Sequence, residues 1–182
     1  MQIQKKFSRI SDEQKSLLIA IDGKSASGKT TFASYLQKNL PCELLHMDDF
    51  FLPIEKREEN WKEIPGGNID FDRFLEEVML PIQKGVTCTV RPFDCKSQSM
   101  KEGRVLGNKK IILIEGAYSC HPKLWDYYDL HIFTDIETKQ QIERIRQRNG
   151  EAGAVRFQEQ WIPLEEAYFR AYEIKEKCEL HF

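Results

Sequence analysis

The 182-residue chain is long enough to bury a core and fits a single α/β domain. It is 41% hydrophobic and 31% charged, as an ordinary globular protein is, and its formal net charge of −2 indicates neither a nucleic-acid nor an anionic-membrane partner. The five cysteines form no C-x-x-C pair, Met1–Gln14 lacks the apolar core of a signal peptide, and no apolar run approaches the roughly 20 residues that span a bilayer. We therefore expect a cytoplasmic protein with reduced thiols.

Short apolar runs alternate with helical patterns, which predicts βαβ units around a parallel sheet. Residues 1–15 are expected to form an extension before the domain. The expected strands are Leu17–Ile21, Cys42–His46, Val86–Val90, Ile111–Ile114, Leu130–Phe133 and Leu180–Phe182. The expected helices are Thr30–Asn39, Phe71–Gln83 (bent or shortened by Pro81), one near Ile136–Arg148, and Gln158–Lys177. We expect a doubly wound, three-layer α/β domain with a sheet of about five strands, near the usual mean.

The segment between the second strand and the second helix is unusual. Asp49–Asn68 carries many charges, two prolines and the pair Gly66-Gly67, so we expect a long mobile loop. A loop of this length without regular structure is more often functional than a mere connection.

A phosphate-binding motif follows the first expected strand. Gly23-Lys24-Ser25-Ala26-Ser27-Gly28-Lys29-Thr30 matches G-x-x-x-x-G-K-[ST] in full and opens the first helix, as this motif requires. Its glycines let the backbone N–H groups approach phosphates at the positive end of that helix. Lys29 is expected to contact the β- and γ-phosphates, and the Thr30 hydroxyl to bind Mg²⁺. The expected nucleotide-binding residues are Gly23, Ser25, Ala26, Ser27, Gly28, Lys29, Thr30 and Thr31.

Two acidic residues follow other expected strands. Glu115 ends the run Ile111–Ile114, where P-loop enzymes place a carboxylate that holds Mg²⁺ or its waters. Asp48 follows Cys42–His46, at the edge of the sheet where ligands bind in open α/β folds. A carboxylate there can accept the proton of an attacking hydroxyl. These positions predict an enzyme that transfers the γ-phosphoryl group of ATP or GTP to a small molecule; the chain has neither the N-K-x-D signature of GTPase switches nor the L-S-G-G-Q segment of transporter ATPases.

The order of the motifs resembles the uridine kinase family, to which phosphoribulokinase, pantothenate kinase and nicotinamide riboside kinase are related. The resemblance covers about residues 16–170 and rests on the P-loop, Asp48-Asp49-Phe50, Gly67-Asn68-Ile69-Asp70-Phe71-Asp72, Arg91-Pro92-Phe93-Asp94, Ile114-Glu115-Gly116 and the Arg144–Arg148 run. It implies a P-loop kinase domain in which Asp48 is the catalytic base and Asp70 holds the ribose hydroxyls. Asp70 can also cap the following helix, a role for which Asp72 competes.

The resemblance further implies a lid at about residues 144–157 whose arginines close over the triphosphate. Arg144 and Arg148 share one helix face and are expected to act in catalysis. Arg156, beyond the expected flexible segment Asn149–Gly153, is expected to contact substrate.

Base recognition departs from the family pattern. The family's Tyr-Asp-Phe-x-x-His segment is matched by Phe93-Asp94-Cys95-Lys96-Ser97-Gln98, in which Phe93 can stack on a base and Gln98 can hydrogen-bond to one. We expect phosphorylation of the 5′-hydroxyl of a ribonucleoside, uridine or cytidine first. The alternatives are a kinase of another alcohol, such as nicotinamide riboside or pantothenate, and a nucleotide-binding regulatory protein without transfer. The expected partner is a small nucleoside-like molecule, and a homo-oligomer is compatible with the sequence.

Overall fold

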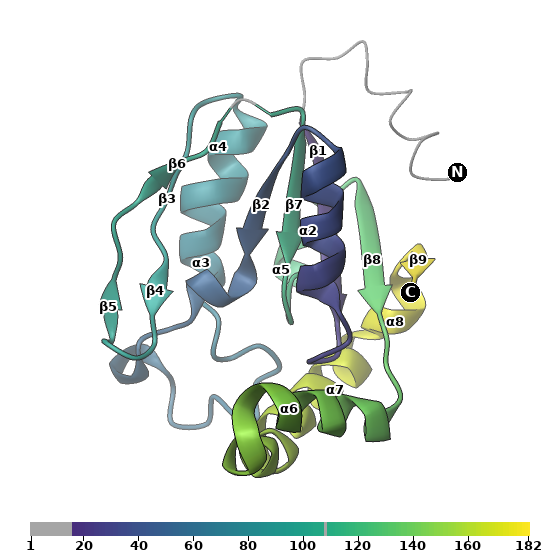
Figure 1. The fold of residues 1–182 in the computed structure, drawn as a ribbon. Helices are drawn as coiled ribbons and strands as arrows, with labels where there is room; N and C mark the ends of the chain where they lie inside the picture. The colour runs from purple at the N-terminus through teal and green to yellow at the C-terminus, as the bar shows by residue number, and fades with distance from the viewer. Residues whose placement is uncertain (1–15, 108) are drawn as a thin grey trace.

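A computed structural model describes residues 16–107 and 109–182; the expected extension 1–15 lies outside the described residues. Five parallel strands form the central sheet in the order β2-β7-β1-β8-β9 (Figure 1). Their bounds are β1 Leu17–Gly23, β2 Cys42–His46, β7 Ile111–Glu115, β8 Leu130–Thr134 and β9 Leu180–His181. The strand order confirms the expected doubly wound parallel sheet.

Helices cover both faces of this sheet. Alternate residues of β1 point to opposite sides: Leu18 and Ala20 join one buried cluster, and Leu17, Ile19 and Ile21 join the other. The helices are α2 Lys29–Asn39, α3 Phe71–Phe74, α4 Leu80–Gln83, α5 Pro122–Trp125, α6 Thr138–Arg156, α7 Ile162–Tyr172 and α8 Ile174–Lys177. The result is the expected three-layer arrangement.

Two of the expected helices contain irregular turns. The helix expected over Phe71–Gln83 forms, but a π-helical stretch, Leu75–Met79, joins α3 to α4, and Pro81 lies inside α4. A second π-helical stretch, Phe157–Trp161, joins α6 to α7. Such stretches often lie at functional sites.

The expected strand Val86–Val90 was placed wrongly. Only β3 (Thr89–Val90) is extended, and it pairs antiparallel with β6 (Arg104–Val105) outside the central sheet. A second small hairpin, β4 (Phe93–Asp94) with β5 (Ser99–Met100), was not expected. Both lie to the left of α3 and α4 in Figure 1. Cys95 and Gln98, between β4 and β5, line the cavity described below.

The region after β2 has little regular structure, as expected. Two 3₁₀ turns, Met47–Phe50 and Ile54–Lys56, interrupt it, and an isolated antiparallel bridge joins Phe51 to Ile69. Among the described residues, no helix has both the length and the apolar character that crossing a bilayer requires.

Candidate active site

The phosphate loop joins the end of β1 to the start of α2. Gly23, Ala26 and Gly28 all have positive φ angles, of 134°, 61° and 107°. Gly23 packs so tightly against β8 that a Cβ atom there would lie 2.0 Å from the carbonyl oxygen of Thr134. Gly23 therefore cannot be replaced without a clash, because its backbone lies so close to β8. Ala26 has a left-handed backbone conformation that is unfavourable for alanine, so contacts around it must stabilise it.

Lys29 lies at the first turn of α2 and is only 9% exposed. Its Nζ atom donates hydrogen bonds to the carbonyl oxygens of Gly23, at 2.7 Å, and Lys24, at 2.9 Å. The positive charge also lowers the pKa of two nearby acids, Asp48 and Glu165, against the larger effect of burial. Lys29 is therefore a fixed, buried cation shared among several carboxyl groups.

Thr30, Glu115 and His46 meet beside the loop. The Thr30 hydroxyl lies 3.2 and 3.3 Å from the two carboxylate oxygens of Glu115. His46 Nδ1 lies 2.6 Å from Glu115 Oε1, and this hydrogen bond raises the pKa of His46. A hydroxyl and a carboxylate that converge in this way offer the oxygen ligands that Mg²⁺ prefers, so the residues fit the expected ion. The position of His46 was not expected.

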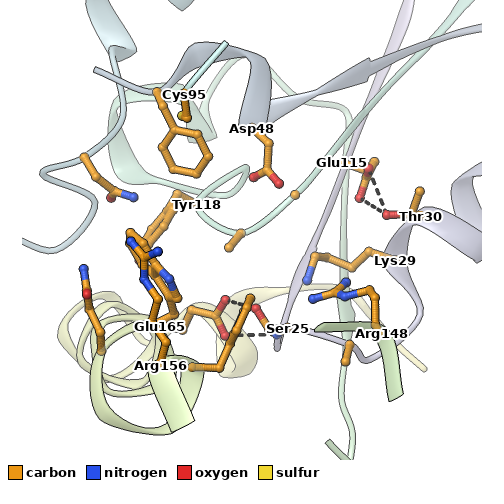
Figure 2. A pocket seen from close by; sticks show the side chains of 18 of the residues that line it. Ser25, Lys29, Thr30, Asp48, Cys95, Glu115, Tyr118, Arg148, Arg156 and Glu165 are labelled. Carbon is orange, nitrogen blue, oxygen red and sulfur yellow. Dashed lines mark hydrogen bonds between the residues drawn. The ribbon is translucent and has the colours of Figure 1, made fainter. Parts of the chain in front are cut away.

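Asp48 lies across a cavity of about 1180 Å³ from the phosphate loop (Figure 2). Its side chain is exposed to the cavity, and desolvation by the surrounding protein groups raises its pKa; the charge of Lys29 opposes the shift. Asp48 and the loop residues Ser25, Ala26, Gly28, Lys29, Thr30 and Thr31 all line this one space, as does Glu115.

The three expected arginines also line the cavity. Arg144 donates to the carbonyl oxygen of Ala26 at 3.1 Å. Arg148 lies over the ring of Phe157, and Arg156 lies over the ring of Trp161. Figure 2 shows Arg148 close to Lys29 and Arg156 at the other side of the cavity. Within α6, Gly150 has φ 74° and ψ 177°, so a kink separates Arg148 from Arg156.

Four expected site residues do not line the cavity. Gly23 and Ser27 belong to the loop but not to the lining of the cavity, and the Ser27 hydroxyl lies 2.5 Å from that of Thr134. Asp70 caps α3 by accepting the backbone N–H of Arg73. Phe93 is buried in β4.

Gln98 does line the cavity, but its side-chain amide is engaged at both ends. Its Oε1 accepts from the N–H of Ile54 at 3.2 Å, and its Nε2 donates to the carbonyl oxygen of Cys95 at 2.6 Å. Gln98 thus ties the β4–β5 hairpin to the loop after β2.

Other residues reach the cavity without having been expected there, among them Asn68, Tyr118, Trp161 and Glu165. Asn68 is 2% exposed, and its Nδ2 atom has no hydrogen-bond partner among the described residues. Asn68 belongs to the Gly67–Asp72 segment of the family resemblance, so the sequence could have identified it as a site residue. No sequence pattern could have identified Glu165, because a single glutamate in a helical pattern resembles any solvent-facing residue.

A parallel sheet, a phosphate loop and an acid across a shared cavity define a P-loop kinase. The phosphoribulokinase/uridine kinase family model matches residues 18–152, and the chain belongs to that family.

Individual relatives agree with this assignment. The chain is 28% identical over 137 residues to uridine-cytidine kinase B of Dictyostelium discoideum, covering 70% of this chain and 56% of that one. It is 52% identical over 75 residues to human nicotinamide riboside kinase 1, covering 41% and 36%. The chain thus spans about half or less of these curated relatives. A solved structure of a possible uridine kinase from Bacillus stearothermophilus has the same fold, with a TM-score of 0.72, 20% identity and full coverage of both chains.

Proposed function

We propose that the protein transfers the γ-phosphoryl group of ATP, or GTP, to the 5′-hydroxyl of a ribonucleoside, with uridine and cytidine as the first candidates. The observation that carries this proposal is the position of Asp48, which faces the phosphate loop across one cavity. A hydroxyl bound between the two would lie in line with the γ-phosphorus, where a carboxylate can accept its proton.

Each remaining group has a role that follows from its position. Lys29, Arg144 and Arg148 would stabilise negative charge on the transferring group, since preorganised cations act strongly in a site shielded from water. Thr30 and Glu115 would hold Mg²⁺, which when bound neutralises phosphate charge. The segment at about residues 144–157 would act as the lid, with the break at Gly150 as its bend. We also propose that residues 16–182 form one domain and that the five unpaired cysteines reflect a reducing, cytoplasmic location.

The acceptor class rests on the relatives. One relative is a uridine-cytidine kinase, and another is a nicotinamide riboside kinase, so a ribonucleoside is the acceptor common to both. The aromatic residues Phe51, Tyr118 and Trp161 line the cavity and would suit a flat base. A kinase of pantothenate or another alcohol, and a regulatory nucleotide-binding protein, are the alternatives.

The test is a transfer assay with Mg²⁺–ATP or Mg²⁺–GTP and a panel of uridine, cytidine, nicotinamide riboside and pantothenate. Release of nucleoside diphosphate and the mass of the product are measured together. We expect a 5′-monophosphate from at least one ribonucleoside, and none from the Lys29→Ala variant. Transfer to pantothenate alone would reject the nucleoside class, and nucleotide binding without transfer to any alcohol would favour the regulatory alternative.

A further inference from the structure

Helix α7 presents one buried carboxylate to the phosphate loop. Glu165 is 5% exposed, although it lines the cavity. Its Oε2 accepts the backbone N–H of Ser25 at 2.9 Å, and its Oε1 accepts the Ser25 hydroxyl in a second, short hydrogen bond (Figure 2). Two bonds to one loop residue fix both the backbone and the side chain of Ser25.

The loop needs such support at this point. Ala26, the next residue, has a φ of 61°, which costs an L-residue energy unless its surroundings hold it. Its carbonyl oxygen accepts from Arg144 on α6. The Ser25–Ala26 turn is therefore held from one side by Arg144 and from the other by Glu165.

We propose that Glu165 is a positioning residue of the nucleotide site, which holds the Ser25–Ala26 half of the phosphate loop in its phosphate-binding shape. The inference rests on the proposed nucleotide role of this loop. It adds a constraint from α7, the helix that directly continues the lid segment, and so links the shape of the loop to the position of the lid.

The charge of Glu165 gives this role a measurable signature. The groups that face its carboxyl are Lys29 on α2, Asp22 on β1 and Tyr118 after β7. Burial raises the pKa of Glu165, while Lys29 and the bonds from Ser25 oppose the shift. Phosphates entering the same cavity repel the ionised form. A protonated carboxyl can still accept the Ser25 N–H and donate to the hydroxyl, so nucleotide affinity should rise as the pH falls.

The experiment measures the affinity of Mg²⁺–ADP by titration calorimetry at pH 8 and pH 6. Glu165→Ala loses both bonds, so its affinity should fall about tenfold at pH 8. Glu165→Gln keeps neutral versions of both bonds, so it should bind at least as tightly as the wild type at pH 8. Its affinity should also tighten less than that of the wild type between pH 8 and pH 6, and the tightening that remains comes from other acids of the cavity, such as Asp48. Glu176→Ala is the control and should match the wild type, since Glu176 is an exposed acid on α8 outside the cavity.

A second variant covers the case in which Glu165→Ala does not fold. Ser25→Ala removes the hydroxyl but keeps the N–H, so affinity should fall about threefold, as expected for one hydrogen bond. The inference is overturned if Glu165→Ala or Ser25→Ala binds Mg²⁺–ADP as the wild type does, or if Glu165→Gln is as weak as Glu165→Ala. If the wild type itself does not bind Mg²⁺–ADP, the nucleotide site and the inference both fall.

Discussion

At the scale of single residues, Asp48 and Asp49 are adjacent acids in unequal surroundings. Desolvation raises the pKa of both carboxyl groups, but only Asp48 lines the cavity. Asp49 does not line the cavity, and its backbone carbonyl oxygen accepts a hydrogen bond from Arg73. The two positions therefore distinguish the proposed catalytic base, Asp48, from its neighbour.

Asp48→Asn should reduce kcat by about 10²- to 10⁴-fold, the range for loss of a positioned general base, with little change in nucleotide affinity. A base must be ionised to act, so wild-type kcat should fall as the pH drops through the raised pKa of Asp48. Steady-state rates across pH measure both effects. Asp49→Asn is the control; if it is crippled while Asp48→Asn is near normal, the base has been assigned to the wrong aspartate.

Asn68 offers a second prediction at this scale, because its buried Nδ2 atom has no partner to lose among the described residues. Asn68→Leu keeps the branching of the side chain but removes its amide, and it should raise the KM for the acceptor about tenfold, the cost of about one hydrogen bond, without lowering the melting temperature. Asp70→Ala should do the reverse: it removes the cap of α3 and leaves the acceptor KM unchanged. A stability loss in Asn68→Leu would show that the amide serves the fold.

Site residues that belong to a sequence motif could be predicted, and site residues outside any motif could not. Lys29, Thr30, Glu115 and Asp48 each follow a strand in a recognisable pattern, and all line the cavity. Glu165 reaches Ser25 from 140 positions away in the chain. Nothing local to either residue encodes that contact.

At the scale of elements, the junction of β1 and β8 determines where the phosphate loop begins. Gly23 pairs with Thr134 in the parallel register of the two strands. A methyl group at Gly23 would lie within 2.0 Å of the Thr134 carbonyl oxygen and 2.6 Å of its hydroxyl.

Gly23→Ala should therefore destabilise the protein by about 3 kcal/mol or more, because overpacking adds to the strain of a positive φ. Gly28→Ala is a matched comparison in the same loop, since a methyl group there meets no atom within 4 Å. It should cost only the backbone strain, about 1–2 kcal/mol. Urea unfolding measures the free energy of unfolding of both variants. Equal losses would mean that β1 and β8 can move apart to accommodate the methyl group at little cost.

Helices and strands with a clear hydrophobic pattern were predicted well, and the short strands without such a pattern were not. β1 and β7 begin with continuous apolar runs, typical of strands buried on both faces. Thr89–Val90 and Phe93–Asp94 are two-residue strands, too short to show an alternating pattern, and each forms only by pairing with another two-residue strand. The break at Gly150 fell within the expected flexible segment, but helix α6 continues beyond it to Arg156.

At the scale of the whole molecule, one buried acid joins three distant parts of the chain. Asp22, at the end of β1, accepts hydrogen bonds from the N–H groups of Gly23 and Cys120 and from the hydroxyl of Tyr168. It thereby ties the phosphate loop to the segment after β7 and to α7. Burial raises the pKa of Asp22, so this acid favours the folded state more as the pH falls.

His121 acts in the opposite direction. It precedes α5, stacks on Phe71 with ring centres 4.0 Å apart, and accepts the N–H of Lys123. Burial, with a smaller contribution from the charge of Lys123, lowers its pKa from 6.5 to about 4. The ring is therefore neutral in the folded protein at pH values where the unfolded chain already binds a proton.

Stability from the neutral His121 should be complete above pH 6.5 and lost as the pH falls toward 4, by on the order of 3 kcal/mol. His121→Asn keeps a side chain able to cap α5 but does not titrate. The wild type should be the more stable of the two at pH 7.5, and this difference should shrink between pH 6.5 and 4 because Asp22 contributes equally to both proteins. Urea unfolding at half-unit pH steps measures the difference. Parallel pH curves would show that protonated His121 is accommodated without cost.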